Sequence, residues 1–316
     1  MKMSREDGGH RGFPDEDIAV AGPADLEAHE IDAAELARLD DFLSAALGEI
    51  LPAKLVKESI SKTHKGRLMS VADAAGQLML IPFEVGPDGS GQVGEPLFHP
   101  RAEGLRDGLI RRAAVEIAAK GARTIYVALD PDDVLGQAFL GAGFSRGPLM
   151  LEMTGETPPS EAAPGEGRWV LYDASRRAQF AAVFYRTLEG SLDFPELPVS
   201  RDGAKLMETF EGRGGFSAED FVVLEGAEGG GAILILVELP ERALEIAYMG
   251  VVPELRGRGV GRLLMARTFE RARARGARRV SVTVDSRNIP AASLYRKSGL
   301  SEKRAVRVYL RAGKIF

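Results

Sequence analysis

A glycine- and arginine-rich turn follows an apolar run in the last quarter of this 316-residue chain. The apolar run covers residues 244–252, and the turn contains Arg256, Gly257, Arg258, Gly259 and Gly261. Glycine lets a backbone approach a ligand closely, and the first turn of a helix presents unpaired N–H groups at the positive end of the helix dipole. Because the next residues predict a helix, the turn is suited to bind phosphate.

A dinucleotide-binding turn is one interpretation of these residues. The next predicted strand, residues 279–284, is followed by Asp285, about where a ribose-binding carboxylate stands in such a fold. The pattern Gly-x-Gly-x-x-Gly must lie tight against its strand, however. Here Arg262 occupies the third glycine position, and residues 253–256 separate the strand from the glycines. The spacing therefore argues against a dinucleotide site.

A second motif favours another interpretation. Residues 288–300 contain Asn288, Ala291, Leu294, Tyr295, Gly299 and Leu300. Together with Arg256-x-x-Gly259-x-Gly261, they resemble the two signatures of the GCN5-related N-acetyltransferase (GNAT) superfamily. These signatures are Gln/Arg-x-x-Gly-x-Gly/Ala and Asn-x-x-Ala-x-x-Leu-Tyr-x-x-x-Gly-Phe. Every position matches except the last, where the apolar Leu300 replaces Phe.

The resemblance implies a co-substrate and a reaction. The co-substrate is acetyl-coenzyme A, and a primary amine attacks the thioester directly, which agrees with the absence of cysteine. The pyrophosphate is expected at the turn and the pantetheine arm along the preceding strand. The cofactor-binding residues implied in this way are Val251, Val252, Arg256, Gly257, Arg258, Gly259, Val260, Gly261, Arg262 and Asn288. Asn288 is also a preferred helix N-cap residue.

Two residues are candidates for proton transfer. Glu245 resembles the carboxylate that takes the amine proton in many GNAT enzymes, and a period of two places it on one strand face with Ala247, Met249 and Val251. An exposed glutamate near a strand end is the alternative. Tyr295 occupies the family's general-acid position, and its reference pKa of about 10 is close enough to the thiol value of about 8.5 to ease departure of the thiolate. A packing role is the alternative for Tyr295.

The acceptor amine is expected to contact residues 187–198, where GNAT enzymes form an acceptor wall. Glu189 and Asp193 are candidate substrate residues because carboxylates suit a cationic amine, whereas a solvated acidic loop is the alternative. Three functions remain open: an acetyltransferase for small-molecule amines, a protein N-terminal or lysine acetyltransferase, and a non-catalytic acyl-coenzyme A-binding module. Retention of both motifs disfavours the third.

The resemblance implies an α/β (α+β) protein of two tandem GNAT domains, each with a mixed, largely antiparallel sheet flanked by helices. Residues 154–167 hold three prolines and three glycines without apolar periodicity, which is typical of a linker. We therefore predict domains at 1–155 and 168–316 and a linker at 156–167. In the second domain the pattern predicts strands at 168–172, 221–224 and 232–237 and helices at 176–188 and 203–210.

The first half is a degenerate copy of the second when Pro100 is aligned with Pro253. Gly104 and Gly108 then align with the glycines of the turn, whereas Glu103, Arg106 and Phe139 replace Arg256, Gly259 and Tyr295 in that order. A carboxylate repels phosphate, a side chain blocks backbone approach, and phenylalanine has no hydroxyl proton. The first domain is therefore expected to be non-catalytic, and the arrangement resembles that of tandem-domain members of the superfamily.

Composition bounds the other expectations. With 45% hydrophobic residues, a net charge of −5 and no cysteine, the chain resembles a globular protein without disulfides or thiolate metal sites. It has no apolar run of about 20 residues and no signal-peptide core, so we expect a cytoplasmic protein without membrane contact. The arginines of residues 254–279 lack interleaved aromatic platforms, which disfavours nucleic-acid binding. The four histidines show no metal spacing, and the internal tandem is compatible with a monomer.

Overall fold

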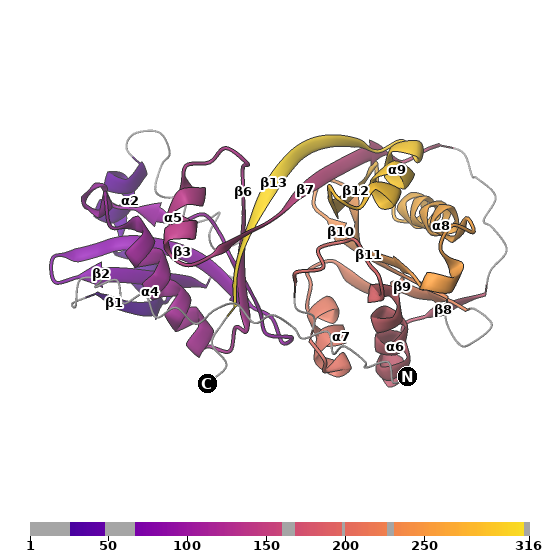
Figure 1. Ribbon diagram of the computed structural model, residues 1–316, viewed down its shortest axis with the longest axis horizontal. Helices are drawn as coiled ribbons and strands as arrows, with labels where there is room; N and C mark the ends of the chain where they lie inside the picture. The colour runs from indigo at the N-terminus through magenta and orange to yellow at the C-terminus, as the bar shows by residue number, and fades with distance from the viewer. Residues whose placement is uncertain (1–25, 48–66, 160–167, 198–199, 226–230, 313–316) are drawn as a thin grey trace, which may run out of the picture.

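The computed structural model describes residues 26–47, 67–159, 168–197, 200–225 and 231–312. Within these residues the strands join in one mixed 13-stranded sheet, and helices pack on it in two halves (Figure 1). The strand order is β1-β2-β3-β4-β6-β13-β7-β12-β11-β10-β9-β8, with β5 paired to β3. Parallel pairing occurs between β4 and β6 and between β11 and β12, whereas the other described pairs are antiparallel. The predicted α/β class, with largely antiparallel strands flanked by helices, is confirmed.

The elements of the N-terminal half are β1 (Glu27–Ile31), α1 (Ala33–Ala37), α2 (Asp40–Leu47), β2 (Leu68–Asp73), β3 (Gly76–Val85), β4 (Ser90–Val93), β5 (Leu97–Phe98), the 3₁₀ turn η2 (Pro100–Ala102), α4 (Arg106–Ala119), β6 (Thr124–Leu129), α5 (Leu135–Gly141) and β7 (Ser145–Glu156).

The elements of the C-terminal half are β8 (Trp169–Leu171), η3 (Ala174–Arg176), α6 (Arg177–Leu188), α7 (Gly203–Glu211), β9 (Phe216–Leu224), β10 (Ala232–Leu239), β11 (Ala243–Val251), η4 (Pro253–Leu255), α8 (Val260–Ala274), β12 (Arg279–Asp285), α9 (Ile289–Lys297) and β13 (Ser301–Ala312). The strands and helices predicted for this half are all present.

The core of the C-terminal half lies on both faces of its sheet. In β10, residues 232–237 are all buried, because α8 and α9 cover one face and α6 and α7 the other. A strand covered on both faces is expected to be a continuous apolar run rather than an alternating one. The sequence Ala-Ile-Leu-Ile-Leu-Val fits this position.

A β-bulge interrupts β11 near its middle. Tyr248 pairs with Ile235 and Ile246 pairs with Leu236, so Ala247 is left without a partner on β10. An extra residue of this kind reverses the alternation of faces beyond it. Met249 accordingly packs on the α8 and α9 side, although Ala247 packs on the α6 and α7 side. The predicted single face for residues 245, 247, 249 and 251 is therefore wrong, and the bulge is the reason.

Strands β11 and β12 part beyond this bulge. Their parallel pairing covers residues 243–246 of β11 and residues 279–282 of β12 and then stops. The last residues of both strands diverge, although they belong to the same sheet. A wedge-shaped opening is thereby formed in the sheet directly before the glycine-rich turn.

The last strand of each half pairs with the other half. All seven residues of β12 pair with residues 150–156 of β7, and β13 pairs with β6 along residues 307–312. Figure 1 shows β7 and β13 running side by side between the two halves, and their register connects residues 145–154 with residues 301–310. Residues 154–156, which the sequence placed at the start of a linker, are therefore part of β7. Residues 160–167 lie outside the described residues.

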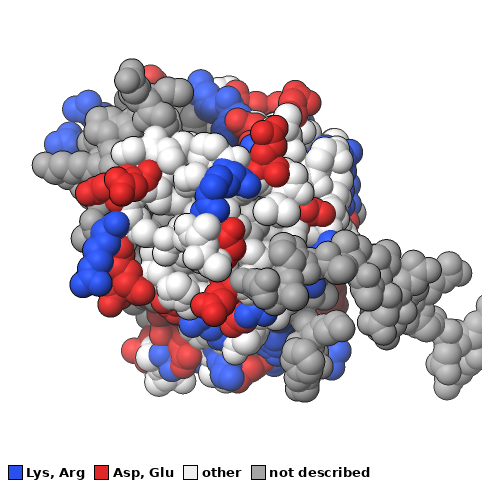
Figure 2. Space-filling view, turned by 90° about the vertical axis from the view of Figure 1, so that its left-hand side faces the viewer, with Lys and Arg blue, Asp and Glu red and all other residues white. Residues whose placement is uncertain are grey.

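In the N-terminal half, α4, β6 and α5 follow one another along the chain as α8, β12 and α9 do in the C-terminal half. The core of the N-terminal half includes Phe139 of α5 together with Tyr309, which β13 brings from the other half. On the face of this half drawn in Figure 2, basic and acidic side chains are interspersed. In the part of the chain that the structure describes, no helix is long and apolar enough to cross a membrane.

Candidate functional site

A cavity of about 700 Å³ opens where β11 and β12 part. Its walls come from the end of α6 and the loop after it, from β11, from the glycine-rich turn with the start of α8, and from α9. The predicted site residues that line it are Val251, Arg256, Gly257, Gly259, Gly261, Arg262, Asn288, Asp193 and Tyr295. The fold thus brings both motifs and part of the predicted acceptor loop together.

The glycine-rich turn presents unpaired N–H groups at the start of α8. Gly257 and Gly259 have φ angles of 74° and 86°, in the left-handed region that favours glycine. Among the described residues, no backbone acceptor is found for the N–H groups of Gly257, Gly259, Val260 and Gly261, and no side chain caps the helix. The dipole of this 15-residue helix adds positive potential at the same point. The arrangement suits a pyrophosphate.

Gly261 also permits close packing of two helices. A β-carbon at this position would lie 2.9 Å from Cδ2 of Leu294 on α9. A side chain here would push α9 away from α8, and α9 carries Tyr295. This glycine of the motif therefore supports the shape of the cavity as well as leaving the backbone accessible.

Arg256 fastens the turn to the end of α6. Its guanidinium donates to the carbonyl oxygens of Val251 at 3.0 Å, Gly190 at 3.2 Å and Thr187 at 2.9 Å. These contacts join the turn, β11 and the start of the acceptor loop. The sequence predicted a cofactor-binding role for Arg256, but it gave no sign of these contacts, because Thr187 and Gly190 are distant along the chain.

Tyr295 lies on α9 with its side chain in the cavity wall. The residue is 5% exposed, and its hydroxyl makes no hydrogen bond with the described residues. Burial raises the pKa of Tyr295 well above its usual range, and the negative charge of Asp193 acts in the same direction. Tyr248 lines the same cavity, but its hydroxyl lies 2.7 Å from Oγ1 of Thr187, and burial raises its pKa to about 12. Both phenols are therefore protonated at neutral pH.

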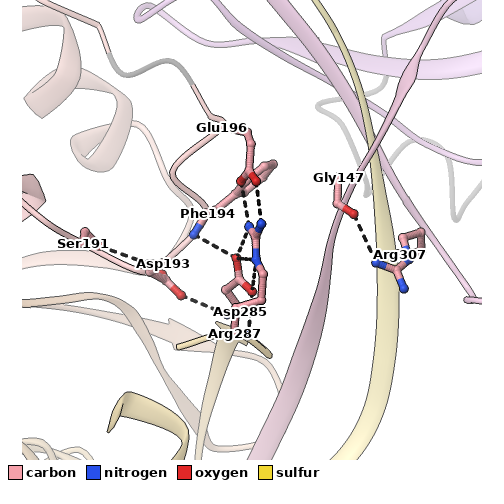
Figure 3. A network of polar contacts seen from close by, with 8 residues as sticks. All are labelled: Gly147, Ser191, Asp193, Phe194, Glu196, Asp285, Arg287 and Arg307. Atoms are coloured by element: carbon pink, nitrogen blue, oxygen red, sulfur yellow. Dashed lines mark hydrogen bonds and ion pairs between the residues drawn. The ribbon is translucent and has the colours of Figure 1, made fainter. Parts of the chain in front are cut away.

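The acceptor loop is fastened to the end of β12 by the network in Figure 3. Asp193 accepts the N–H of Asp285 at 2.9 Å, and Asp285 in turn accepts the N–H of Phe194 at 3.2 Å. The guanidinium of Arg287 donates to Asp285 at 2.6 Å and to both carboxylate oxygens of Glu196, at 2.5 and 2.7 Å. Desolvation and the nearby carboxylate of Asp285 raise the pKa of Asp193, although it is open to solvent at the cavity.

Residues 200–300, which contain this turn and most of the cavity wall, match the acetyltransferase (GNAT) family. The chain resembles the GNAT superfamily in this segment. It is 35% identical over 105 residues to mycothiol acetyltransferase of Beutenbergia cavernae, covering 28% of this chain and 35% of that protein. It is 39% identical over 70 residues to an uncharacterised N-acetyltransferase of Methanocaldococcus jannaschii, covering 22% and 31%. The matched segments span about a third of the length of these curated relatives.

Solved GNAT structures share the fold over nearly the whole chain. A GCN5-related N-acetyltransferase from Sphaerobacter thermophilus superposes with a TM-score of 0.60 at 16% identity, covering 93% of this chain and 98% of that one. A tandem GNAT protein from the clavulanic acid biosynthesis pathway gives a TM-score of 0.54 at 13% identity, covering 92% and 99%. At such identities the likeness is one of fold, and it supports the tandem GNAT architecture.

Glu245, the predicted base, does not line this cavity. It lies in the part of β11 that is still paired with β12, opposite Ser281, and its carboxylate accepts from Arg213 at 2.8 Å. The bulge at Ala247 turns the later residues of β11 to the other face, so Glu245 is separated from Met249 and Val251, which line the cavity. The base role of Glu245 stays a prediction that this placement does not favour.

Four other predicted GNAT residues stay outside the cavity wall. Val252 is 2% exposed, and its N–H donates to Gly231 at 3.0 Å, so the backbone contact expected from it is already used. Glu189 ends α6 as an exposed C-cap residue. Arg258 and Val260 do not line the cavity either, and the N–H of Arg258 donates to Leu255 at 3.4 Å, whereas the N–H of Val260 has no backbone acceptor among the described residues.

The equivalent turn of the N-terminal copy contains its own carboxylate. Gly104 keeps a positive φ of 81°, but α4 begins at Arg106, and Oδ1 of Asp107 accepts the N–H of Gly108 at 2.9 Å. An acidic side chain thus occupies the region where the GNAT turn presents free N–H groups. Phe139 is fully buried there. The sequence comparison noticed three unfavourable replacements but overlooked Asp107.

Several arginines between residues 267 and 275 contact the sheet rather than solvent alone. Arg271 is 17% exposed and donates to the buried Asp220 of β9 at 2.5 Å, and Arg275 reaches the same carboxylate at 2.7 Å. Arg267 lies over the ring of Trp169, 5.7 Å from its centroid. These arginines therefore fasten α8 to the sheet.

Proposed function

We propose that the protein is an acyltransferase that transfers an acetyl group from acetyl-coenzyme A to a primary amine, with the cavity of the C-terminal half as its active site. The observation that carries the proposal is the coincidence of three features in one cavity. A helix N-terminus with unpaired N–H groups, a parted pair of strands and a buried phenol all face it in the described part of the chain.

The donor fits the open edge of the sheet. The N–H groups of the turn would hold the pyrophosphate, and Arg262 adds a positive charge to the same wall. Beyond the bulge, residues 248–251 of β11 have no strand partner on the β12 side among the described residues. Their backbone groups would pair with the amide groups of a pantetheine arm, as a third strand would, and bring the thioester toward Tyr295.

Two side chains would perform the proton transfers. Asp193 faces the cavity from the acceptor loop, and its raised pKa makes it a better proton acceptor than an ordinary aspartate. It would attract the acceptor as an ammonium and take its proton. Tyr295 would donate its hydroxyl proton to the departing thiolate, because the hydroxyl has no hydrogen-bond acceptor among the described residues.

A small-molecule amine is the favoured acceptor class. The relative with the name mycothiol acetyltransferase supports this choice, although the match covers only 28% of this chain. A protein or peptide amine is the alternative. Turnover of acetyl-coenzyme A, measured by thiol release against spermidine, glucosamine, cysteine and a lysine-containing peptide, distinguishes them. Turnover restricted to the peptide would exclude a small-molecule enzyme.

A matched pair of variants tests which half binds the donor. Gly257 and Gly104 occupy equivalent turns, have φ angles of 74° and 81°, and leave open space where a β-carbon would lie. Aspartate tolerates this backbone conformation better than most residues. Gly257→Asp should weaken acetyl-coenzyme A binding at least about tenfold in calorimetry, because its carboxylate would face the phosphates. Gly104→Asp should leave the affinity unchanged, and equal effects would contradict the assignment.

A further inference from the structure

We propose that Arg287, Glu196 and Asp285 form a charged latch that positions the carboxylate of Asp193 for the acceptor amine. The proposal rests on the proposed function, since it assigns positioning residues to the same site. The latch joins the acceptor loop, residues 189–197, to the end of β12. Its hydrogen bonds connect these two segments and leave the donor turn aside.

Two reciprocal hydrogen bonds make the contact directional. The backbone N–H of Asp285 donates to the side chain of Asp193, and the side chain of Asp285 accepts from the backbone N–H of Phe194. The orientation of the Asp193 carboxylate therefore depends on the position of Asp285. Asp285 is 0% exposed, so its own position is fixed by packing and by its partners.

Arg287 is the cation that makes a buried Asp285 tolerable. Desolvation alone would raise the pKa of Asp285, but hydrogen bonds from Arg287 and from the Phe194 N–H hold it below its usual range. The guanidinium lies between the carboxylates of Asp285 and Glu196 and contacts both, as the close-up in Figure 3 shows. Forked guanidinium contacts of this kind fix direction as well as charge. One arginine thus connects two segments 91 residues apart.

Phe194 shows that the loop is held under strain. Its φ angle is 45°, in the left-handed region that a bulky residue rarely adopts. Its ring packs against Met150 of β7 and against Val306 and Val308 of β13. A strained backbone persists where surrounding contacts determine it, and such positions cluster at functional sites. Here the contacts come from the latch on one side and from β7 and β13 on the other.

The charges around Asp193 set the expected pH response. The ionisable groups that share its surroundings are Asp285 and Arg287 at the end of β12, Glu196 in the loop, Tyr248 of β11, Arg256 of the turn, and Tyr295 and Lys297 of α9. Within this described set, Arg287 is the cation that contacts the acidic cluster directly. Without Arg287, the negative charge of Asp285 beside Asp193 has no neutralising cation. Without the charge of Glu196, Arg287 pairs with Asp285 alone.

The two changes should therefore shift the pH profile in opposite directions. In Arg287→Gln, the acidic limb of kcat/KM should move up by about one pH unit, because the negative charge of Asp285 would then act on Asp193 without the opposing charge of Arg287. In Glu196→Gln the limb should stay or move down. Arg287→Lys keeps the charge and should retain the position of the limb with a lower kcat/KM, since the fork is lost. A general loss of structure would not shift the acidic limb in opposite directions in Arg287→Gln and Glu196→Gln.

Arg304→Gln is the matched control, because Arg304 is also 48% exposed and donates to Asp130, far from the cavity. The profiles are measured with the panel amine that the wild type turns over fastest, and acetyl-coenzyme A affinity is measured by calorimetry. Hydrogen exchange of residues 189–197 provides a readout that needs no acceptor, and it should quicken in Arg287→Gln but not in Arg304→Gln. A limb that does not move in Arg287→Gln, or moves equally in Arg304→Gln, overturns the latch. An inactive wild type with normal loop exchange overturns the proposed function instead.

Discussion

Replacement of Tyr295 by phenylalanine separates a catalytic role from a packing role. The ring is buried among residues of α8, α9 and the sheet, and phenylalanine keeps it. Only the hydroxyl is removed, and it has no hydrogen-bond partner among the described residues. Because Tyr295 lines the cavity, removal of its hydroxyl breaks no hydrogen bond to the described residues and should cost little stability. The free energy of unfolding of Tyr295→Phe should therefore stay close to that of the wild type.

The effect on kcat should be large by comparison. General acid catalysis contributes about 10²–10⁴-fold. We expect the lower end, because a thiol with a reference pKa of about 8.5 leaves with partial assistance from water. A hundredfold fall in kcat corresponds to about 2.7 kcal/mol at about 1.36 kcal/mol per factor of ten. Since burial raises the pKa of Tyr295, the phenol stays protonated above neutral pH, and no alkaline limb from this residue is expected near pH 8.

Steady-state kinetics and urea unfolding on two variants provide the assay. Tyr248→Phe is the control, since it loses the hydroxyl contact with Thr187 in the same cavity. It should lower the free energy of unfolding by about 1 kcal/mol and leave kcat within a few-fold. Tyr295→Phe should show the converse, with unchanged acetyl-coenzyme A affinity. Wild-type kcat in Tyr295→Phe would refute the acid assignment and leave proton donation to water.

Three further outcomes are expected. Glu30→Gln should lower the free energy of unfolding by about 1–2 kcal/mol at pH 7, because the Arg67 hydrogen bond lowers the pKa of Glu30 from 4.5 to about 2 and both side chains are partly exposed. In urea unfolding this deficit should shrink as pH falls from 4.5 toward 2, since the wild type then loses the contribution of the ionised carboxylate. Asp220→Ala should cost about 3 kcal/mol in the same assay by leaving Arg271 without its buried partner. Arg106→Asp should leave kcat unchanged, because the altered turn belongs to the N-terminal copy.

The sequence predicted best what depends on local spacing. Asn288 is a preferred N-cap residue, and its side chain accepts from the Ala291 N–H at 3.3 Å. The helix at 176–188 and the apolar strand at 232–237 were predictable because each carries its own periodicity. The N–H groups of the turn were predictable because two closely spaced glycines precede a helix. In each case the signal lies within about ten neighbouring residues.

What the sequence missed depends on contacts between distant segments. The bulge at Ala247 arises from a register shift against β10, and no residue type in the sequence of β11 predicts it. Period-two reasoning therefore placed Glu245 and Met249 on one face, which the structure shows they do not share. The contacts of Arg256 with the end of α6 and of Arg287 with Glu196 join segments more than 60 residues apart. An arginine in a motif indicates a charge, but its partners are set by tertiary packing.

The pairing of β7 with β12 and of β13 with β6 gives the N-terminal half a structural role. A degenerate copy that had lost its own site would be dispensable if each half closed its own sheet. Here β7 pairs with all seven residues of β12, the strand whose end carries Asp285. The same strand supplies Met150 beneath Phe194 of the acceptor loop. Without the N-terminal half, β12 would expose an unpaired edge, and the loop would lose its apolar support. The N-terminal half thus has a structural role whether or not its own turn binds phosphate, because its last strand supports β12 and the loop beside the cavity.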